Sequence, residues 1–307
     1  MKKLLARLGI LLVISLCAST IYGFVWIRQY QQLADEEPAI TISPDIPDIT
    51  YCTMEGVPLK MDLYFPEIDA PFQVLLYVHG GSFTSGDKRT GSGIVDIPAM
   101  TARGYAVAAI NYRLMPEYPF PAEVVDAKCA VRFLRAHAVQ YNLLTEKIGI
   151  WGGSAGGHLV AMMGLTNGDP AFELGENREY SSQVDAVVDM FGPTDLTQPM
   201  SWLQRLILRR AFGTDSPSDA RLIEASPVQY VTRAAPPFLI LNGEQDTAVP
   251  VEQAQALYQK LLDAEVDATL VIVENANHNF KPTGGPIKPT RTEISDIMGD
   301  FFDRLLK

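Results

Sequence analysis

The chain has 307 residues, of which 47% are hydrophobic and 20% are charged, and its formal net charge at pH 7 is -11. The hydrophobic content excludes a disordered chain, and the acidic balance argues against nucleic acid as a partner, because phosphate binding needs clustered lysine and arginine. Three cysteines are too few for a small fold built on disulfides.

The first predicted element is an apolar segment near the N-terminus. Residues 8–27 form an unbroken uncharged run, with three positive charges before it and Arg28 after it. As a helix this run spans roughly 30 Å, the hydrocarbon thickness of a bilayer. The excess of positive charge before the run predicts that Met1 stays cytoplasmic and that the rest is exported. We therefore expect residues 1–28 to form a signal anchor.

A cleaved signal peptide is the alternative interpretation of this segment. Its apolar region would end at Leu16, and the small residues 17–19 offer a cleavage site. The anchor is favoured because residues 21–27 remain apolar and aromatic beyond that site. Residues 29–47, which are acidic and contain prolines, are then expected to form an extended linker.

From residue 48 the chain alternates between strand and helix patterns. Segments 49–52 and 59–65 are expected to pair as a hairpin, and the later runs are apolar throughout, as in strands covered on both faces. Amphipathic patterns at 251–264 and 294–306 predict helices. We predict an α/β fold in residues 48–307, a mostly parallel, doubly wound sheet with an antiparallel start. The apolar runs are 74–78, 106–110, 148–151, 184–190, 238–241 and 269–273.

A long stretch, residues 194–236, interrupts this alternation. It carries Trp202, Leu203, Leu206 and Ile207 at helical spacing. An insertion near a site is often a lid, whereas an apolar stripe is more often part of a core. We predict a lid-like insertion, and both roles stay open for Trp202.

The strongest chemical signal is the pentapeptide Gly-Gly-Ser-Ala-Gly at residues 152–156, which follows a predicted strand and precedes a predicted helix. The flanking glycines of this G-x-S-x-G pattern allow a turn sharp enough to lift Ser154 above the sheet with its hydroxyl exposed. The same residues also fit a glycine-rich helix start capped by serine. The strand-turn-helix context favours a nucleophile.

A second glycine motif, His-Gly-Gly-Ser-Phe, follows the predicted strand at 74–78. Acyl transfer builds negative charge on a carbonyl oxygen, and a positioned N–H donor stabilises this charge by roughly 3 kcal/mol. We assign an oxyanion hole to the backbone N–H groups of Gly81, Ser82 and Ala155. His79 is expected to anchor the loop and not to act as a base.

A serine nucleophile needs a base, and the base needs a carboxylate that orients it. The chain has four histidines. His278 is the predicted base, because it lies in a polar loop after the strand at 269–273, at the sheet edge where catalytic groups collect. His137 and His158 are expected to lie on helices in structural or exposed positions.

Two acidic residues compete for the role of the carboxylate. Asp246 lies in the loop between the strand at 238–241 and the following helix, and it is our prediction, with Glu244 as the alternative. The resulting order of serine, aspartate and histidine along the chain is that of α/β-hydrolases. The two other familiar orders of serine proteases are thereby disfavoured.

Several segments match one group of enzymes: H-G-G-S-F at 79–83, N-Y-R-L-M-P-E-Y-P-F-P-A at 111–122, G-G-S-A-G-G-H at 152–158, F-G-P-T-D-L at 191–196, S-P-V-Q-Y-V at 226–231 and D-T-A-V-P at 246–250. With them the chain resembles α/β-hydrolase esterases of the hormone-sensitive-lipase-like and bacterial feruloyl- and acetyl-xylan-esterase-like carboxylesterase group. The resemblance covers nearly everything after about residue 48. It implies a cofactor-free carboxylic-ester hydrolase acting on small-molecule esters of short acyl groups, with Ser154, Asp246 and His278 as its triad.

Two positions depart from the pattern of that group. Ser82 stands where a third glycine or another small residue is usual, although its N–H can still donate. Gly153 stands where a larger residue usually precedes the nucleophile, which predicts a more open pocket wall. The alternative functions are a serine peptidase or lipase of the same fold and a non-catalytic, hydrolase-like binding protein.

Export also bears on the cysteines and on the surface charge. Cys52 and Cys129 could pair in an oxidising compartment, and the sequence leaves their proximity open. Four of the 25 positive residues lie in 1–28, so 21 remain against 36 negative ones, a charge of -15 that should be repelled by anionic lipid. We expect an extracytoplasmic catalytic domain held at the membrane by its N-terminal helix, or secreted if that helix is cleaved. The oligomeric state does not follow from the sequence.

Overall fold

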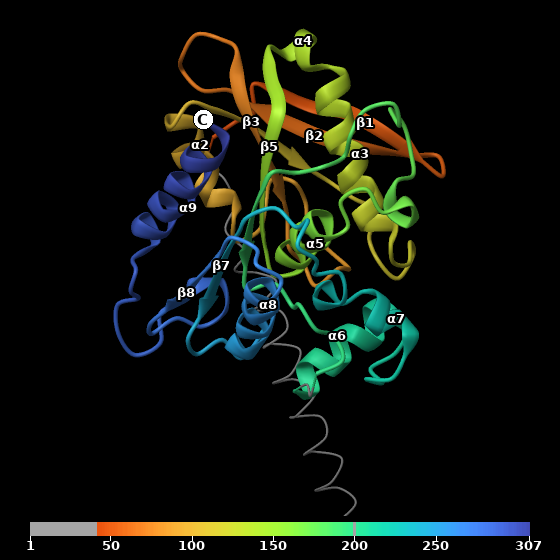
Figure 1. The fold of residues 1–307 in the computed structure, drawn as a ribbon, viewed down its shortest axis with the longest axis vertical. Helices are drawn as coiled ribbons and strands as arrows, with labels where there is room; N and C mark the ends of the chain where they lie inside the picture. Colours follow the sequence, from red (N-terminus) through yellow and green to blue (C-terminus); the bar gives the residue numbers. More distant parts are fainter. Residues whose placement is uncertain (1–41, 199–200) are drawn as a thin grey trace, which may run out of the picture. The chain divides into compact units, whose positions relative to one another are not determined.

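The computed structural model describes residues 42–198 and 201–307. Within them, eight strands form one sheet in the order β1-β2-β4-β3-β5-β6-β7-β8 (Figure 1). The β1–β2 and β2–β4 pairs are antiparallel, and all later pairs are parallel, which confirms the predicted mostly parallel sheet with an antiparallel start. The strands are β1 (Ile46–Met54), β2 (Val57–Tyr64), β3 (Phe72–Val78), β4 (Tyr105–Ile110), β5 (Leu143–Gly153), β6 (Ala186–Met190), β7 (Phe238–Gly243) and β8 (Ala268–Val273).

Helices cover both faces of the sheet (Figure 1). α3, α5 and α8 pack on one face, and α2 and α9 pack on the other. Every residue of β4 is buried, as expected for a strand with a hydrophobic layer on each side. The helices are α2 (Ile97–Ala102), α3 (Ala122–Ala136), α4 (Ala138–Tyr141), α5 (Ala155–Leu165), α6 (Trp202–Phe212), α7 (Ala220–Glu224), α8 (Val251–Asp263) and α9 (Arg291–Leu306), with 3-10 turns η1 (Ile94–Asp96), η2 (Pro170–Phe172), η3 (Pro227–Gln229) and η4 (His278–Phe280).

The N-terminal predictions fall mostly outside this description. The predicted anchor at 1–28 and most of the linker at 29–47 lie outside the described residues. β1 begins at Ile46, so the last two linker positions belong to the sheet instead. In the part of the chain that is described, no helix has both the length and the apolar character to span a bilayer.

Cys52 and Cys129 form a disulfide that joins β1 to α3. Their Cα atoms are 6.4 Å apart, within the usual range for such bonds, and both side chains are buried. The two residues are 77 positions apart in sequence. Local patterns could not bring them together, because their proximity depends on the antiparallel hairpin packing along α3.

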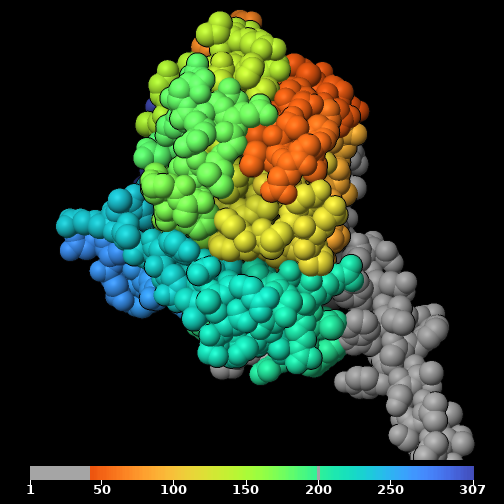
Figure 2. All heavy atoms as spheres, turned by 90° about the vertical axis from the view of Figure 1, so that its right-hand side faces the viewer, coloured from red at the N-terminus to blue at the C-terminus, as the bar shows by residue number. Residues whose placement is uncertain are grey.

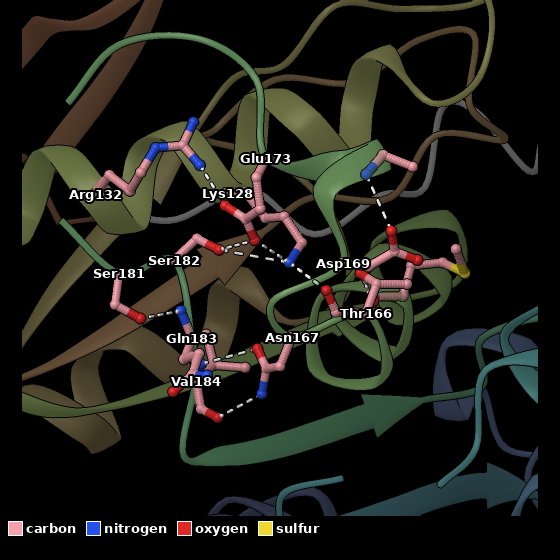
Figure 3. Close-up of polar contacts among 12 residues, drawn as sticks. Lys128, Arg132, Thr166, Asn167, Asp169, Glu173, Ser181, Ser182, Gln183 and Val184 are labelled. Atoms are coloured by element: carbon pink, nitrogen blue, oxygen red, sulfur yellow. Dashed lines mark hydrogen bonds and ion pairs between the residues drawn. The ribbon is translucent and has the colours of Figure 1, made fainter. Parts of the chain in front are cut away.

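The loop of residues 166–184 is fastened to α3 by two buried cations (Figure 3). Lys128 Nζ donates to the carbonyl of Thr166 at 2.8 Å and to Glu173 Oε1 at 2.9 Å. Arg132 donates to the other oxygen of Glu173 at 2.8 Å. Because buried charges are costly unless they are paired, these contacts hold the loop closely against the helix.

The same loop extends over the disulfide. Cys129 Sγ lies 3.8 Å from the carbonyl oxygen of Glu176, and the Glu176 carboxylate accepts from the N–H of Thr53 in β1 at 2.8 Å. Figure 2 shows the loop, in green, on the same face as the orange β1–β2 hairpin. The loop at 166–184 therefore covers the disulfide. It forms hydrogen bonds with both β1 and α3, the two elements that the disulfide joins.

Glu123, in the first turn of α3, is buried, and neither of its carboxyl oxygens accepts a hydrogen bond from another residue of the described part. Burial raises its pKa from 4.5 to about 8. Between these two values the folded chain binds more protons than the unfolded chain, so stability falls as the pH rises from 4.5 through 8. Asp189 in β6 acts in the same direction, since burial raises its pKa to about 7.

We therefore expect Glu123→Gln to stabilise the fold in a pH-dependent way. The amide removes the ionisation that burial opposes, so the free energy of unfolding should rise on the order of 3 kcal/mol at pH 8 and by less than about 1 kcal/mol at pH 5. Urea unfolding of both proteins at pH 5, 6.5 and 8 measures this difference. An equal effect at pH 5 and pH 8 would contradict the assignment.

Candidate active site

Ser154 lies in the turn between β5 and α5 with φ of 57° and ψ of -122°. A non-glycine residue held in this conformation costs roughly 1–3 kcal/mol, which is typical of functional turns. A Cβ on Gly152 would lie 2.6 Å from the backbone of Gly156, so the close approach requires glycine. The Ser154 N–H donates to the carbonyl of Met190 at 2.9 Å, which fixes the turn to the end of β6. The predicted strand-turn-helix context is therefore present.

Three side chains from separate turns meet at the C-terminal edge of the sheet. His278, on η4 after β8, places Nε2 3.0 Å from Ser154 Oγ and Nδ1 2.8 Å from Asp246 Oδ2. The Asp246 side chain is fully buried, and its Oδ1 accepts from the N–H groups of Ala248 and Val249 at 2.9 and 2.8 Å. A carboxylate only accepts, so Nδ1 carries the imidazole proton and Nε2 can accept from the serine hydroxyl.

The competing carboxylate does not take this position. Glu244 is exposed, and its Oε2 accepts from the backbone N–H of Asn275 at 3.3 Å. The structure thus brings Asp246, and not Glu244, to the imidazole.

The other three histidines bond to backbone carbonyls. His79 Nδ1 lies 2.6 Å from the carbonyl of Gly80, and His158 Nε2 lies 2.7 Å from the carbonyl of Ala225. Burial lowers the pKa of both imidazoles to about 4, so they are neutral at pH 7. His137, half-buried, follows the end of α3. His79 anchors its loop, as the sequence predicts.

The loop of the predicted oxyanion hole packs against the nucleophile turn. A Cβ on Gly80 would lie 2.8 Å from the carbonyl oxygen of Gly153. Gly81 and Ser82 follow with positive φ values of 116° and 53°, and the first of these requires the freedom of glycine. Counting only described residues, the N–H groups of Gly81, Ser82 and Ala155 donate to no protein acceptor. Free N–H donors in the nucleophile turn and in a loop packed against it are what an oxyanion hole requires.

The space beside Gly153 is filled by an aromatic ring. A Cβ on Gly153 would lie 2.9 Å from the ring of Phe191, which is buried directly after β6. This ring meets the imidazole of His278 edge-on with a centroid distance of 4.8 Å. The prediction that Gly153 opens the pocket wall is therefore wrong, because the missing side chain makes room for Phe191.

The insertion at 194–236 forms a wall next to the nucleophile. Its α6 is the helix that the apolar spacing predicts, but Trp202 lies half exposed, and the buried residues are found at the other end of the helix. Ala155, which follows the nucleophile, belongs to the same apolar cluster as α6 and α7. The buried members of this cluster are Phe83, Met115, Ala155, Leu196, Leu208, Ala211, Phe212, Leu222 and Ala225.

Comparison with known proteins assigns this arrangement to a family. The BD-FAE family model matches residues 61–261. The chain belongs to the BD-FAE family. Esterase LipC of Mycobacterium tuberculosis is 34% identical over 199 residues, which cover 62% of this chain and 48% of that protein. This BD-FAE chain spans about half the length of its mycobacterial relatives LipC, LipM and LipQ, between 44% and 56%.

Solved structures agree with the family. A truncated carbohydrate esterase from gut microbiota has a TM-score of 0.73 and 26% identity to this BD-FAE chain, and the match covers 88% of this chain and 99% of that one. Propionate-bound esterase Est2 of Thermogutta terrifontis has a TM-score of 0.69 and 26% identity, with 85% and 94% covered. The predicted resemblance to α/β-hydrolase esterases of the hormone-sensitive-lipase and feruloyl-esterase type is confirmed.

Proposed function

We propose that the chain is a serine carboxylesterase that hydrolyses small-molecule esters of short acyl groups through an acyl-enzyme on Ser154. The observation that carries this proposal is the continuous hydrogen-bonded line from Asp246 through His278 to Ser154 Oγ, with distances of 2.8 and 3.0 Å. The free N–H donors of the nucleophile turn and of the loop packed against it, together with the esterase relatives, support the same reaction class.

The mechanism follows from this geometry. His278 Nε2 accepts the proton of Ser154 Oγ as the oxygen attacks the ester carbonyl carbon, and Asp246 stabilises the imidazolium that forms. The N–H groups of the oxyanion hole donate to the negative oxygen of the tetrahedral intermediate. The alcohol leaves with the proton from His278, which leaves the acyl group on Ser154. A water molecule then repeats both steps and releases the acid.

The apolar wall next to the nucleophile is evidence for a preference for short acyl groups. Phe83, Leu208 and Phe212 are each less than one tenth exposed and pack in one cluster with Ala155. Volume beside the serine is therefore already filled by side chains, which leaves little room for a long chain. The Est2 relative is known in a propionate-bound form.

The test is a panel of p-nitrophenyl esters from C2 to C12 with the full chain, together with a fluorophosphonate probe. We expect kcat/KM to be highest at C2–C4 and at least about tenfold lower at C8, and we expect the probe to label Ser154. A maximum at C8 or above would indicate a lipase, and cleavage of peptide amides would indicate a peptidase. Absence of both turnover and labelling would indicate a binding protein.

We also propose that residues 8–27 anchor the enzyme in a membrane with the catalytic domain on the extracytoplasmic side. The apolar length and the flanking charges support this placement. The disulfide of the catalytic domain fits an oxidising compartment. The full chain should stay in the membrane pellet after alkaline carbonate washing, and a chain without residues 1–28 should be soluble and active. A mature N-terminus directly after residues 17–19 would instead establish a cleaved signal peptide.

A further inference from the structure

The histidine loop contains asparagines on both sides of His278, and the sequence pattern gives them no role. Asn277 Oδ1 accepts from the N–H of His278 at 2.7 Å, and from the N–H and hydroxyl of Thr247 at 3.0 and 3.3 Å. Thr247 directly follows Asp246. The Asn277 amide therefore ties the loop of the imidazole to the loop of the carboxylate.

Asn279, on the other side of His278, reaches a third segment. Its Oδ1 accepts from the hydroxyl of Ser92 at 2.5 Å. Ser92 is 9% exposed, and its Cβ lies 3.4 Å from the position that a Cβ on Gly153 would take. This bond thus links the histidine loop to a segment that packs against the residue before the nucleophile.

The Ser92–Asn279 hydrogen bond matters because His278 lies in a very short turn. η4 is a 3-10 turn of three residues beyond the last strand, so His278 does not lie on a long helix or strand. Asn279 has φ of 61°, a left-handed conformation in which asparagine is tolerated better than most residues. The phenyl ring of Phe191 packs against the imidazole but cannot donate or accept a conventional hydrogen bond. Backbone hydrogen bonds close the turn on itself, from the N–H of Asn277 to the carbonyl of Lys281 and from the N–H of Lys281 to the carbonyl of His278. The side chains of Asn277 and Asn279 then attach this closed turn to neighbouring segments of the site.

We propose that Ser92 and Asn279 are positioning residues, whose hydrogen bond holds the imidazole of His278 in line between Asp246 and Ser154. The proposal rests on the esterase function proposed above, in which His278 accepts the serine proton. A displaced imidazole lengthens the bond to Ser154 or the bond to Asp246, which slows proton transfer. The bond joins two protein side chains that are not part of the predicted oxyanion hole, so we expect ester binding to be unaffected by its loss. The expected result is a lower kcat at an unchanged KM.

The test compares variants of the full chain with p-nitrophenyl acetate. Ser92→Ala removes the donor, and Asn279→Gly removes the acceptor while keeping a residue that tolerates positive φ. We expect each change to lower kcat about tenfold with KM unchanged, and the double variant to be no slower than the slower single variant, because both remove one bond. Ser92→Thr keeps the hydroxyl and should recover at least about half of the kcat.

Ser295 offers a matched control. Its hydroxyl donates to Asp96 Oδ1 at 2.6 Å, a bond of similar length between α9 and η1, so Ser295→Ala should leave kcat unchanged. Unchanged kcat in Ser92→Ala and Asn279→Gly, or losses that multiply in the double variant, would overturn the positioning role. A wild-type chain that neither hydrolyses esters nor reacts with the fluorophosphonate probe would overturn the proposed function instead.

Discussion

Replacing Ser154 with alanine is expected to lower kcat for p-nitrophenyl acetate by about 10⁵-fold or more. The variant loses the nucleophile, and only the oxyanion hole and substrate binding remain to accelerate hydrolysis by water. Alanine meets the same strained φ of 57° as serine, so the melting temperature should stay within about 2 °C of wild type. Initial rates of the purified full chain, with thermal unfolding of the same samples, measure both quantities.

Three further variants separate a triad from a lone reactive serine: His278→Ala, its combination with Ser154→Ala, and Asp246→Asn. If the three side chains act together, His278→Ala should cost nearly as much as Ser154→Ala, and the double variant should be no slower than Ser154→Ala alone. Asp246→Asn should lower kcat by about 10⁴-fold, because the amide no longer holds the imidazole in the required tautomer. Full activity in Ser154→Ala would show that the nucleophile lies elsewhere.

The parts of the site that the sequence could predict are those with a local cause. The glycines around Ser154 are spaced for a sharp turn, and the apolar run before them identifies a buried strand. Parallel strands place their C-terminal ends along one edge, so the sequence predicts that the loops after β7 and β8 reach the same region. The structure brings Asp246 and His278 there, within hydrogen-bonding distance of one another.

Other features depend on packing between segments far apart in sequence. Phe191 fills the space beside Gly153, although Gly153 ends β5 and Phe191 follows the end of β6. The spacing of apolar residues in α6 predicts a helix, but it does not identify Leu208 and Phe212 as the buried residues, because that choice depends on where the insertion meets the site. The Ser92–Asn279 bond joins residues 187 positions apart.

Removal of the Cys52–Cys129 disulfide is expected to lower the melting temperature by about 8 °C. The bond closes a loop across 77 positions, and in the chain-entropy model such a constraint on the unfolded state stabilises the fold by about 4 kcal/mol. For a domain of this size, each kcal/mol corresponds to roughly 2 °C. The loop at 166–184 retains its own bonds to Lys128 and Arg132, so the native fold should persist at 25 °C without the disulfide.

Thermal unfolding with and without dithiothreitol tests this expectation in the wild type and in a Cys52→Ala/Cys129→Ala variant. Reductant should lower the melting temperature of the wild type to near that of the variant, and it should not change the variant, which has no bond to lose. Counting free thiols in each sample shows whether reduction was complete, which is necessary because the loop at 166–184 covers the bond. An unchanged melting temperature in fully reduced wild type would contradict this expectation. It would mean that residual contact between the segments of β1 and α3 already restricts the unfolded chain without the covalent link.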